Sequence, residues 1–558
     1  MKKKIIGNTI LFVGILLFIN IFNMMFGQEN SVVGVAVITA SLMLLQRDLT
    51  ASPLENFINL AIFNVFAGLC AYVADINMWI GIPVNFIALF VIGYLCSSNL
   101  KFPIVIGFGL QYLFMLFTPV YGKSFVMRIA GLIFGAFFTM LLQLIANKNK
   151  LKKNFKNTLI GIISDFINQL EDGKKCYSLV NDKINIIKKI VYESRKKDFY
   201  ICDEGKKVTN IIHLLEKINI ILENNSLDND LEAKKYIIES LKDFKISVEN
   251  ENLDTSNIKI DYSKYSSEVI NILRLFDKVE NEVISLSKVE VNGKINFYDI
   301  PEKFKMIKVI KNNLNRDSLK FSYGLRLAIV GAVSIFIVNL FNIPEGKWIA
   351  YTILSLTQPY MESSKIRARQ RIEGTLIGGV IIGVAFILVK DSSARGMIIL
   401  LAGYLNSFMK DYRNLITIVT ISAVASTVVE GGAFGIATLR LLLIIAGAGF
   451  ATLGTKFIIP YKIVDGNKEI ENGYEKIIKT MEEDIREHKD ENVVKSLYLI
   501  PAFLETKLKD TNTDENEIAR LMKFVDEKRK VINEVYSKYY FEHEVEEDRN
   551  YKTSLVTE

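Results

Sequence analysis

Two clusters of apolar segments, with a polar block between them, dominate the pattern along this chain. Each cluster holds six apolar runs, many of them close to the ~20 residues that a helix needs to cross about 30 Å of hydrocarbon. The first cluster comprises 5–26, 31–46, 57–74, 79–97, 102–118 and 126–146. The second comprises 323–342, 347–360, 374–389, 396–409, 413–429 and 436–459. Alternation of period two is absent from these runs, so the pattern predicts transmembrane helices.

The polar parts of the chain show helical periodicity as well. Apolar positions recur at helical spacing in four stretches of the central block, 154–170, 208–224, 231–248 and 263–286. The C-terminal part is typical of two or three further amphipathic helices. We therefore expect an all-α membrane protein with four parts. These are a first transmembrane half (1–146), a cytoplasmic helical domain (147–320), a second transmembrane half (321–460) and a cytoplasmic C-terminal helical region (461–558).

The two apolar clusters share landmarks at a constant spacing. The pairs Gln46 and Gln358, Arg128 and Arg440, and Gly135 and Gly447 are each 312 residues apart. Gly93-Tyr94 and Gly403-Tyr404 match at a spacing of 310. Six spans in each half, an even number, make both halves run in the same direction. The spacing therefore predicts a parallel repeat of two six-helix halves, related by an axis along the membrane normal.

Charge sets the expected orientation. Of the 558 residues 50% are hydrophobic, the mean hydropathy is +0.25 and the net charge is +7. Lys and Arg gather on one set of span flanks, including 2–4, 148–156 and 365–371. The positive-inside rule then places the N-terminus, the central block and the C-terminus in the cytoplasm of a multi-pass protein of the cell membrane. The surplus cations suit lipid head groups, and no basic stripe interleaved with aromatic residues indicates a nucleic-acid partner.

Enzyme motifs are missing from the sequence. It contains no GxxxxGK[ST], no HExxH and no GxSxG, so we expect no catalytic residue, no metal site and no cofactor. The three histidines, His213, His488 and His543, all lie in polar segments. This topology excludes a histidine proton relay through the membrane, so any proton coupling would need carboxylates.

Arg128 and Arg440 are the first candidates for a binding site. An arginine in a span costs roughly 2.5–3.5 kcal/mol on insertion scales, so its side chain normally faces the bundle interior or water. At equivalent places in two halves, the two guanidinium groups could hold one carboxylate between them. The alternative is that both side chains snorkel to the outer head groups.

The second run of each half is a further candidate. The runs 31–46 and 347–360 are short and end at Gln46 and at Gln358-Pro359. Short or Pro-interrupted segments at corresponding places in two repeats point to a transporter site. Tyr351 and Thr357 would contribute polar groups there, unless these are ordinary short helices whose polar groups bond neighbouring helices.

A basic stretch follows in the second half, and we expect residues 363–375 to be a loop. Its cations Arg367, Arg369 and Arg371 indicate an orientation signal and an anion-collecting inner mouth. Glu373 is expected to pair with Arg371, or to serve as a coupling carboxylate. Glu345, at the other end of the bundle, is expected to be solvated. Small residues that would form close helix-packing faces are Gly374, Gly378, Gly379 and Gly383, with Gly135 and Gly447 in the sixth spans.

These motifs resemble a known family. The run Trp348-x9-Gln358-Pro359, the cations 367–371 and Gly374-Thr375-x2-Gly378 are similar to the fusaric acid resistance (FUSC-like) family. The late span from Arg440 to Pro460 is similar as well. The family includes bacterial aromatic acid exporters, and plant aluminium-activated malate channels are distantly similar. The second half carries the better motif, because Asp48-Leu49-Thr50-Ala51 replaces the family's Tyr-x-Glu-Ser in the first.

The resemblance implies export of organic, often aromatic, carboxylates. Our first hypothesis is a secondary exporter in the cell membrane with its site between the two halves. An anion channel lined by the same cations is the second, and a membrane scaffold or sensor with a cytoplasmic partner is the third. The sequence leaves open the substrate, the coupling ion, a homo-oligomer and an envelope partner.

Overall fold

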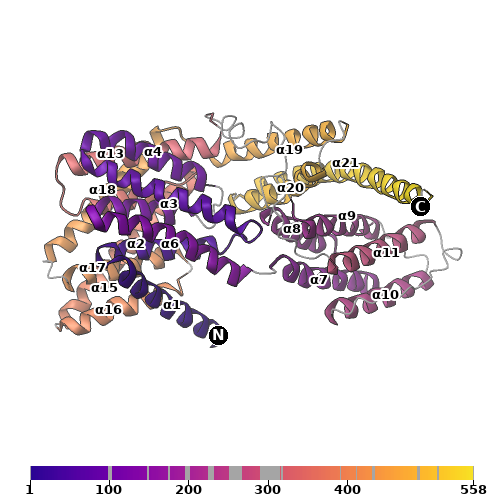
Figure 1. Cartoon of the computed structure of the whole chain (residues 1–558), viewed down its shortest axis with the longest axis horizontal. Coiled ribbons are helices and arrows are strands. Elements are labelled where there is room, and N and C mark those ends of the chain that lie inside the picture. Colours follow the sequence, from indigo (N-terminus) through magenta and orange to yellow (C-terminus); the bar gives the residue numbers. More distant parts are fainter. Residues whose placement is uncertain are drawn as a thin grey trace. The chain divides into compact units, whose positions relative to one another are not determined.

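The computed structural model describes residues 2–97, 104–147, 150–173, 176–194, 201–223, 231–250, 267–288, 314–315, 318–389, 391–409, 411–429, 434–486, 491–511 and 514–556. Regular structure in these ranges is entirely helical, which confirms the all-α class for the described residues (Figure 1). The chain forms two compact units. The apolar unit contains 1–46, 54–142 and 309–469, and the polar unit contains 47–53, 143–308 and 470–558.

Helices occupy each of the twelve apolar runs. In the first cluster they are α1 (Lys2–Phe26), α2 (Ser31–Leu44), α3 (Pro53–Ile76), α4 (Met78–Cys96), α5 (Ile104–Phe117) and α6 (Gly122–Asn147), with a short turn η1 (Gln28–Asn30) before α2. In the second they are α13 (Leu319–Leu340), α14 (Lys347–Leu356), α15 (Met361–Leu388), α16 (Ser392–Asn406), α17 (Tyr412–Val429) and α18 (Phe434–Phe457).

Seven helical stretches of the described chain are long and apolar enough to cross a membrane: α1, α3, α4, the stretch that begins with α6, α13, α15 and α18. The chain is therefore a multi-pass membrane protein. That all twelve helices span as two six-helix halves stays a prediction. The run 347–360 in particular gives a helix of only ten residues, α14, which is about 15 Å long at 1.5 Å per residue.

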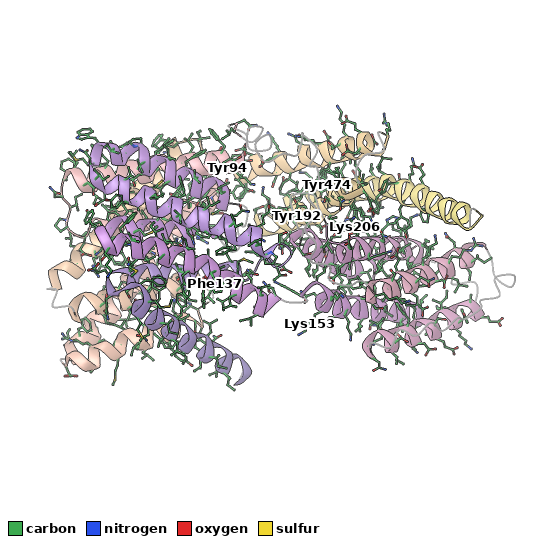
Figure 2. All side chains as sticks on the ribbon, in the orientation of Figure 1. Tyr94, Phe137, Lys153, Tyr192, Lys206 and Tyr474 are labelled. Carbon is green, nitrogen blue, oxygen red and sulfur yellow. The ribbon has the colours of Figure 1, made fainter. Side chains whose placement is uncertain are left out.

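The surfaces of the two units differ in the way that lipid requires. Large apolar side chains such as Phe137, Met24 and Ile62 are exposed on the apolar unit. On the polar unit, exposed positions such as Lys153 carry charge (Figure 2). A continuous apolar exterior is rare on soluble proteins and is expected where acyl chains replace water.

Two helix contacts in the apolar unit involve residues at the spacing of the predicted repeat. Helix α4 packs on α13, where a Cβ on Gly93 would lie 2.9 Å from the Cα of Gly324. Helix α1 contacts α16 in the corresponding way: the rings of Phe12 and Tyr404 are 5.6 Å apart. Phe12 and Gly324 are 312 residues apart in the sequence. Helices α4 and α13 approach closely because both contacting residues are glycines, whereas the aromatic ring of Phe12 lies between α1 and α16.

The helices of the polar unit come from two separate chain segments. They are α7 (Lys150–Asp172), α8 (Tyr177–Glu193), α9 (Asp203–Glu223), α10 (Leu231–Asn250), α11 (Ser267–Ser287), α19 (Ile463–Arg486, from residue 470 onward), α20 (Glu491–Thr511) and α21 (Glu515–Val556). The helices expected at 154–170, 208–224, 231–248 and 263–286 are confirmed over the residues that the structure describes, as are the amphipathic helices of the C-terminal part; residues 224 and 263–266 lie outside the described residues. One hydrophobic core includes Leu159 and Ile211 from the first segment and Tyr498 and Tyr536 from the second.

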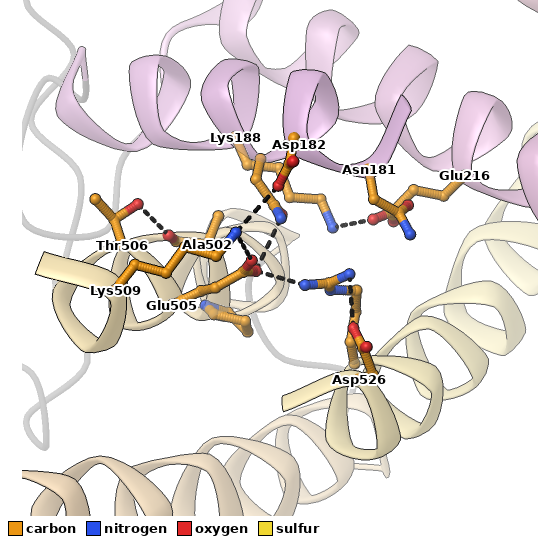
Figure 3. A network of polar contacts seen from close by, with 12 residues as sticks. Asn181, Asp182, Lys188, Glu216, Ala502, Glu505, Thr506, Lys509 and Asp526 are labelled. Atoms are coloured by element: carbon orange, nitrogen blue, oxygen red, sulfur yellow. Dashed lines mark hydrogen bonds and ion pairs between the residues drawn. The ribbon is translucent and has the colours of Figure 1, made fainter. Parts of the chain in front are cut away.

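A buried network of charges also joins the two segments (Figure 3). Between α8 and α9, the Lys188 ammonium lies 2.7 Å from Oε1 of Glu216. The other carboxylate oxygen of Glu216 accepts a hydrogen bond from the Tyr498 hydroxyl of α20. Burial lowers the pKa of Lys188, although Glu216 opposes this. Nearby, Glu505 of α20 pairs with Arg529 of α21.

We expect Glu216→Gln to destabilise the polar unit by about 3–5 kcal/mol, because it leaves the Lys188 ammonium buried without a counter-charge. Hydrogen exchange of α8 and α9 in the full chain measures the loss. The control is Glu171→Gln, which removes an exposed ion pair with Lys242 and should change stability by less than about 1 kcal/mol. Equal exchange in the two variants would contradict the prediction.

Candidate functional site

A small cavity in the apolar unit brings two arginines together. It lies between α14, α15, α17 and α18 and has a volume of about 10 Å³, enough for roughly one water molecule. Its lining residues are Trp348, Arg371, Val419, Thr420, Ala423, Val424, Arg440, Leu441 and Ile444. Two guanidinium groups from different helices therefore border one mostly apolar space.

Arg440 is held by three groups. Its Nε donates to a carboxylate oxygen of Glu345 at 2.7 Å, its Nη1 donates to the Ala423 carbonyl at 2.7 Å, and its guanidinium stacks on the Trp348 ring at 5.2 Å. Only 8% of Arg440 is exposed. Glu345 also accepts from the Trp348 indole at 3.0 Å. The expectation that Glu345 is simply solvated was wrong, because 21% of its side chain is exposed and its carboxylate is engaged by Arg440.

Arg371 reaches the cavity because the expected loop is helical. Helix α15 begins at Met361, so residues 363–375 are its first half, and the charges there do not interrupt it. Arg371 is 7% exposed, and its Nε has no hydrogen-bond partner among the described residues. Glu373 pairs instead with Arg369 at 2.7 Å and Arg413 at 3.8 Å. Positions two apart on a helix face different directions, so the expected pairing of Glu373 with Arg371 was wrong.

The three cations expected at an inner mouth lie in different surroundings. The side chain of Arg369 is 84% exposed. The guanidinium of Arg367 stacks on the Tyr412 ring at 4.9 Å, and its Nη1 lacks a partner among the described residues. Arg371 alone of the three lines the cavity.

Arg128 is engaged within the first half. Its Nε donates to Asn30 at 2.8 Å, its Nη1 to the Met115 carbonyl at 3.2 Å and its Nη2 to the Glu29 carbonyl at 3.4 Å. No contact between Arg128 and Arg440 is found among the described residues, and neither side chain extends out of the bundle. Each arginine ties its sixth helix to the fifth helix and to the residues before the second helix of the same half.

The polar groups after α14 mostly bond to one another. The side-chain amide of Gln358 donates back to the Ser355 and Thr357 carbonyls at 3.0 and 3.2 Å. The Thr357 hydroxyl is buried and has no partner among the described residues.

Tyr351 packs edge-on against Phe114 with ring centroids 5.3 Å apart. Gln46 follows the end of α2 at Leu44.

Sequence reasoning missed Arg326 of α13, which is fully buried. Its guanidinium donates to the carbonyls of Gln358 at 2.9 Å, Ile459 at 2.8 Å and Ile458 at 3.3 Å. Ile459 has a φ of +42°, a left-handed conformation that a β-branched residue rarely adopts. A charge four residues into an apolar run was the available signal. The position 312 residues earlier holds Gly14, so the repeat spacing does not mark Arg326.

We expect Arg326→Gln to lower the thermal stability of the purified protein in detergent. Each buried carbonyl left without a donor costs about 1–3 kcal/mol, and Arg326 supplies several. Arg395→Gln is the matched control, because Arg395 also donates to carbonyls but only to those of the nearby Val389 and Phe386. A smaller drop in melting temperature for Arg326→Gln than for Arg395→Gln would refute this assignment.

Comparison with known proteins identifies the segment that contains the cavity. Residues 332–454 match the family model described as fusaric acid resistance protein-like. This segment is a fusaric acid resistance protein-like domain. It includes Glu345, Trp348, Arg371 and Arg440, and the family resemblance of the second half is thereby confirmed.

Three relatives are themselves uncharacterized proteins. ORF2 of Neisseria gonorrhoeae is 31% identical over 155 residues, which is 27% of this chain and 37% of that protein. A protein of Synechocystis sp. is 31% identical over 80 residues (14% of this chain, 11% of that protein), and one of Haemophilus influenzae is 37% identical over 73 residues (13% and 10%). The matched parts thus cover well under two thirds of each relative. No solved structure matches the chain.

Glycines set the spacing of helices in the fusaric acid resistance protein-like domain. A Cβ on Gly374 would lie 2.6 Å from the Arg413 carbonyl, and one on Gly378 would lie 2.6 Å from the Thr417 carbonyl, so α15 presses closely on α17. The other glycines expected to pack closely differ among themselves. A Cβ would come within 2.7 Å of a neighbour at Gly135, 2.9 Å at Gly447 and 3.3 Å at Gly379, and would meet nothing within 4 Å at Gly383.

We expect Gly378→Ala to lower the thermal stability of the domain, because the added methyl group must push α15 away from the α17 backbone at a cost of about 1–3 kcal/mol. Gly383→Ala on the same helix should be neutral or stabilising, since alanine favours a helix over glycine by up to about 1 kcal/mol. Melting temperatures in detergent measure both effects. Equal melting temperatures for the two variants would show that the close approach of α15 and α17 is not needed.

Proposed function

We propose that the protein is a secondary transporter that exports organic anions, aromatic carboxylates among them, across the cell membrane. The observation that carries the proposal is the imbalance of charge at the cavity. Two buried cations, Arg371 and Arg440, line it, and the carboxylate of Glu345 that binds Arg440 is not among its lining residues. A buried charge without a counter-ion is costly, so the excess of positive charge favours the binding of an anion.

The chemistry of the lining suits a carboxylate on an apolar or aromatic body. Guanidinium groups bind carboxylates through parallel hydrogen bonds, and the Nε of Arg371 is free to donate. Aromatic and aliphatic side chains, Trp348, Leu441 and Ile444 among them, offer surface for an aromatic ring. A volume of about 10 Å³ holds no such ligand, so binding requires the helices around the cavity to separate.

Membership of the fusaric acid resistance protein-like family over residues 332–454 supports transport as the general activity. We further propose that the termini and the central block lie in the cytoplasm, as the distribution of Lys and Arg predicts. The polar unit would then be available to a cytoplasmic partner. The experiment that tests the exporter hypothesis also tests the channel and scaffold hypotheses.

We expect Arg440→Gln and Arg371→Gln to reduce benzoate flux in proteoliposomes at least tenfold. A hydrogen bond to a charged group contributes about 1.5–3 kcal/mol, which corresponds to roughly ten- to hundredfold in affinity. The control is Arg369→Gln on the same helix. The Arg369 side chain is largely in solvent, so this variant should leave flux unchanged.

The form of the flux separates the three hypotheses. Saturable flux driven by an ion gradient supports the exporter, and large unitary anion currents would replace it with the channel. If Arg440→Gln and Arg371→Gln both leave every flux unchanged, the transport function is refuted in favour of the scaffold.

A further inference from the structure

The carboxylate of Glu345 binds the guanidinium group that a substrate anion would use. Glu345 and the Ala423 carbonyl take two of the five N–H donors of Arg440, the one on Nε and one on Nη1. An incoming carboxylate that binds Arg440 must therefore displace Glu345 or lie beside it. Two carboxylates on one buried guanidinium repel each other unless one of them takes up a proton.

The backbone fixes Glu345 in this position. It lies in the turn between α13 and α14 with a φ of +59°, and Asn342 in the same turn has a φ of +46°. Such conformations in residues other than glycine persist only where the surroundings impose them. A Cβ on Gly346 would lie 2.4 Å from Val338, so this turn is packed tightly against α13. The carboxylate is thus presented to Arg440 by a rigid segment.

We propose that Glu345 is a built-in competitor for the anion site, occupying Arg440 while the site is empty and taking up a proton when an organic carboxylate binds there. This inference rests on the proposed function, because it concerns the same site. It assigns a coupling role to Glu345, whereas the sequence had suggested Glu373.

The groups that face Glu345 determine how it titrates. They are Arg440 from α18, and Lys347, Trp348 and Tyr351 from α14, of which Lys347 lies 3.4 Å from the second carboxylate oxygen. Partial burial raises the pKa of Glu345, but the hydrogen bond from Arg440 and the charges of Lys347 and Arg440 lower it by more, so the pKa lies below its usual value. Glu345 is therefore ionised in the empty site at neutral pH.

The sign of the pH dependence follows from this. A bound anion takes Arg440 away from Glu345 and adds a negative charge beside it, and both changes raise the pKa of Glu345 in the occupied site. At a pH between the pKa of Glu345 in the empty site and its higher pKa in the occupied site, binding of the anion is accompanied by uptake of a proton. Anion affinity then increases as the pH falls, by at most about tenfold per pH unit, and levels off below the lower pKa.

The test uses the fluorescence of Trp348, which donates to Glu345. The chain has two tryptophans, so Trp79→Phe leaves Trp348 as the sole reporter. In this background the full-length protein in lipid nanodiscs is titrated with acid at increasing benzoate. We expect the midpoint of the fluorescence change to move to higher pH as benzoate rises, and Glu345→Gln to abolish the titration. Glu373→Gln, which removes the other carboxylate paired with an arginine in this domain, should leave it unchanged.

The outcomes distinguish this inference from the proposed function. A midpoint that stays fixed as benzoate rises, or a titration that survives in Glu345→Gln, overturns the competitor role, even if flux still depends on Arg440. A midpoint that moves while flux is the same in Arg440→Gln and wild type supports the competitor role and refutes the transport function.

Discussion

Two buried arginines fix the ends of the ten-residue helix α14, and the arrangement of the second half depends on them. This helix is only about 15 Å long, and the polar groups beyond its ends are bound by side chains of other helices. Arg326 donates to the carbonyls of Gln358 and Ile459 beyond one end, and Arg440 binds Glu345 before the other. These bonds hold the chain where it leaves the helix at each end of α14, inside the apolar unit.

Arg128 and Arg440, which lie at corresponding positions of the predicted repeat, make different contacts. Arg128 donates to neutral acceptors only, Asn30 and the Met115 and Glu29 carbonyls. Arg440 instead binds a carboxylate and faces a second arginine across a cavity. The position equivalent to Arg326 holds Gly14 in the first half. The first half thus satisfies its charge internally, and the second carries the unbalanced charge, in the segment with the fusaric acid resistance protein-like match.

The polar unit depends on a different constraint, the joining of two chain segments more than 150 residues apart. Its hydrophobic core takes residues from both segments. The ion pair of Lys188 and Glu216, with the Tyr498 hydroxyl, adds a buried polar contact among α8, α9 and α20. Buried ion pairs add little net stability, but breaking one is costly. The network therefore penalises any arrangement of the segments that separates these groups.

The sequence by itself determined the helices, because the length and periodicity of apolar runs are local properties that the backbone must obey in lipid. Within the residues that the structure describes, it located the twelve apolar helices and the amphipathic helices of the polar unit, and the motifs of the second half indicated the family whose model matches residues 332–454. It did not determine which charged groups meet. Arg440 and Glu345 are 95 residues apart, and Arg326 reaches carbonyls 32 and 133 residues away. The cationic residues around Arg371 resembled a loop because the sequence shows their charge but does not show which of them are buried. Only the packing of α14, α15, α17 and α18 decided that Arg371 faces a cavity and that Glu345 is bound by Arg440. Such partners lie on different helices, and the distance between two residues in the sequence does not show whether their side chains meet.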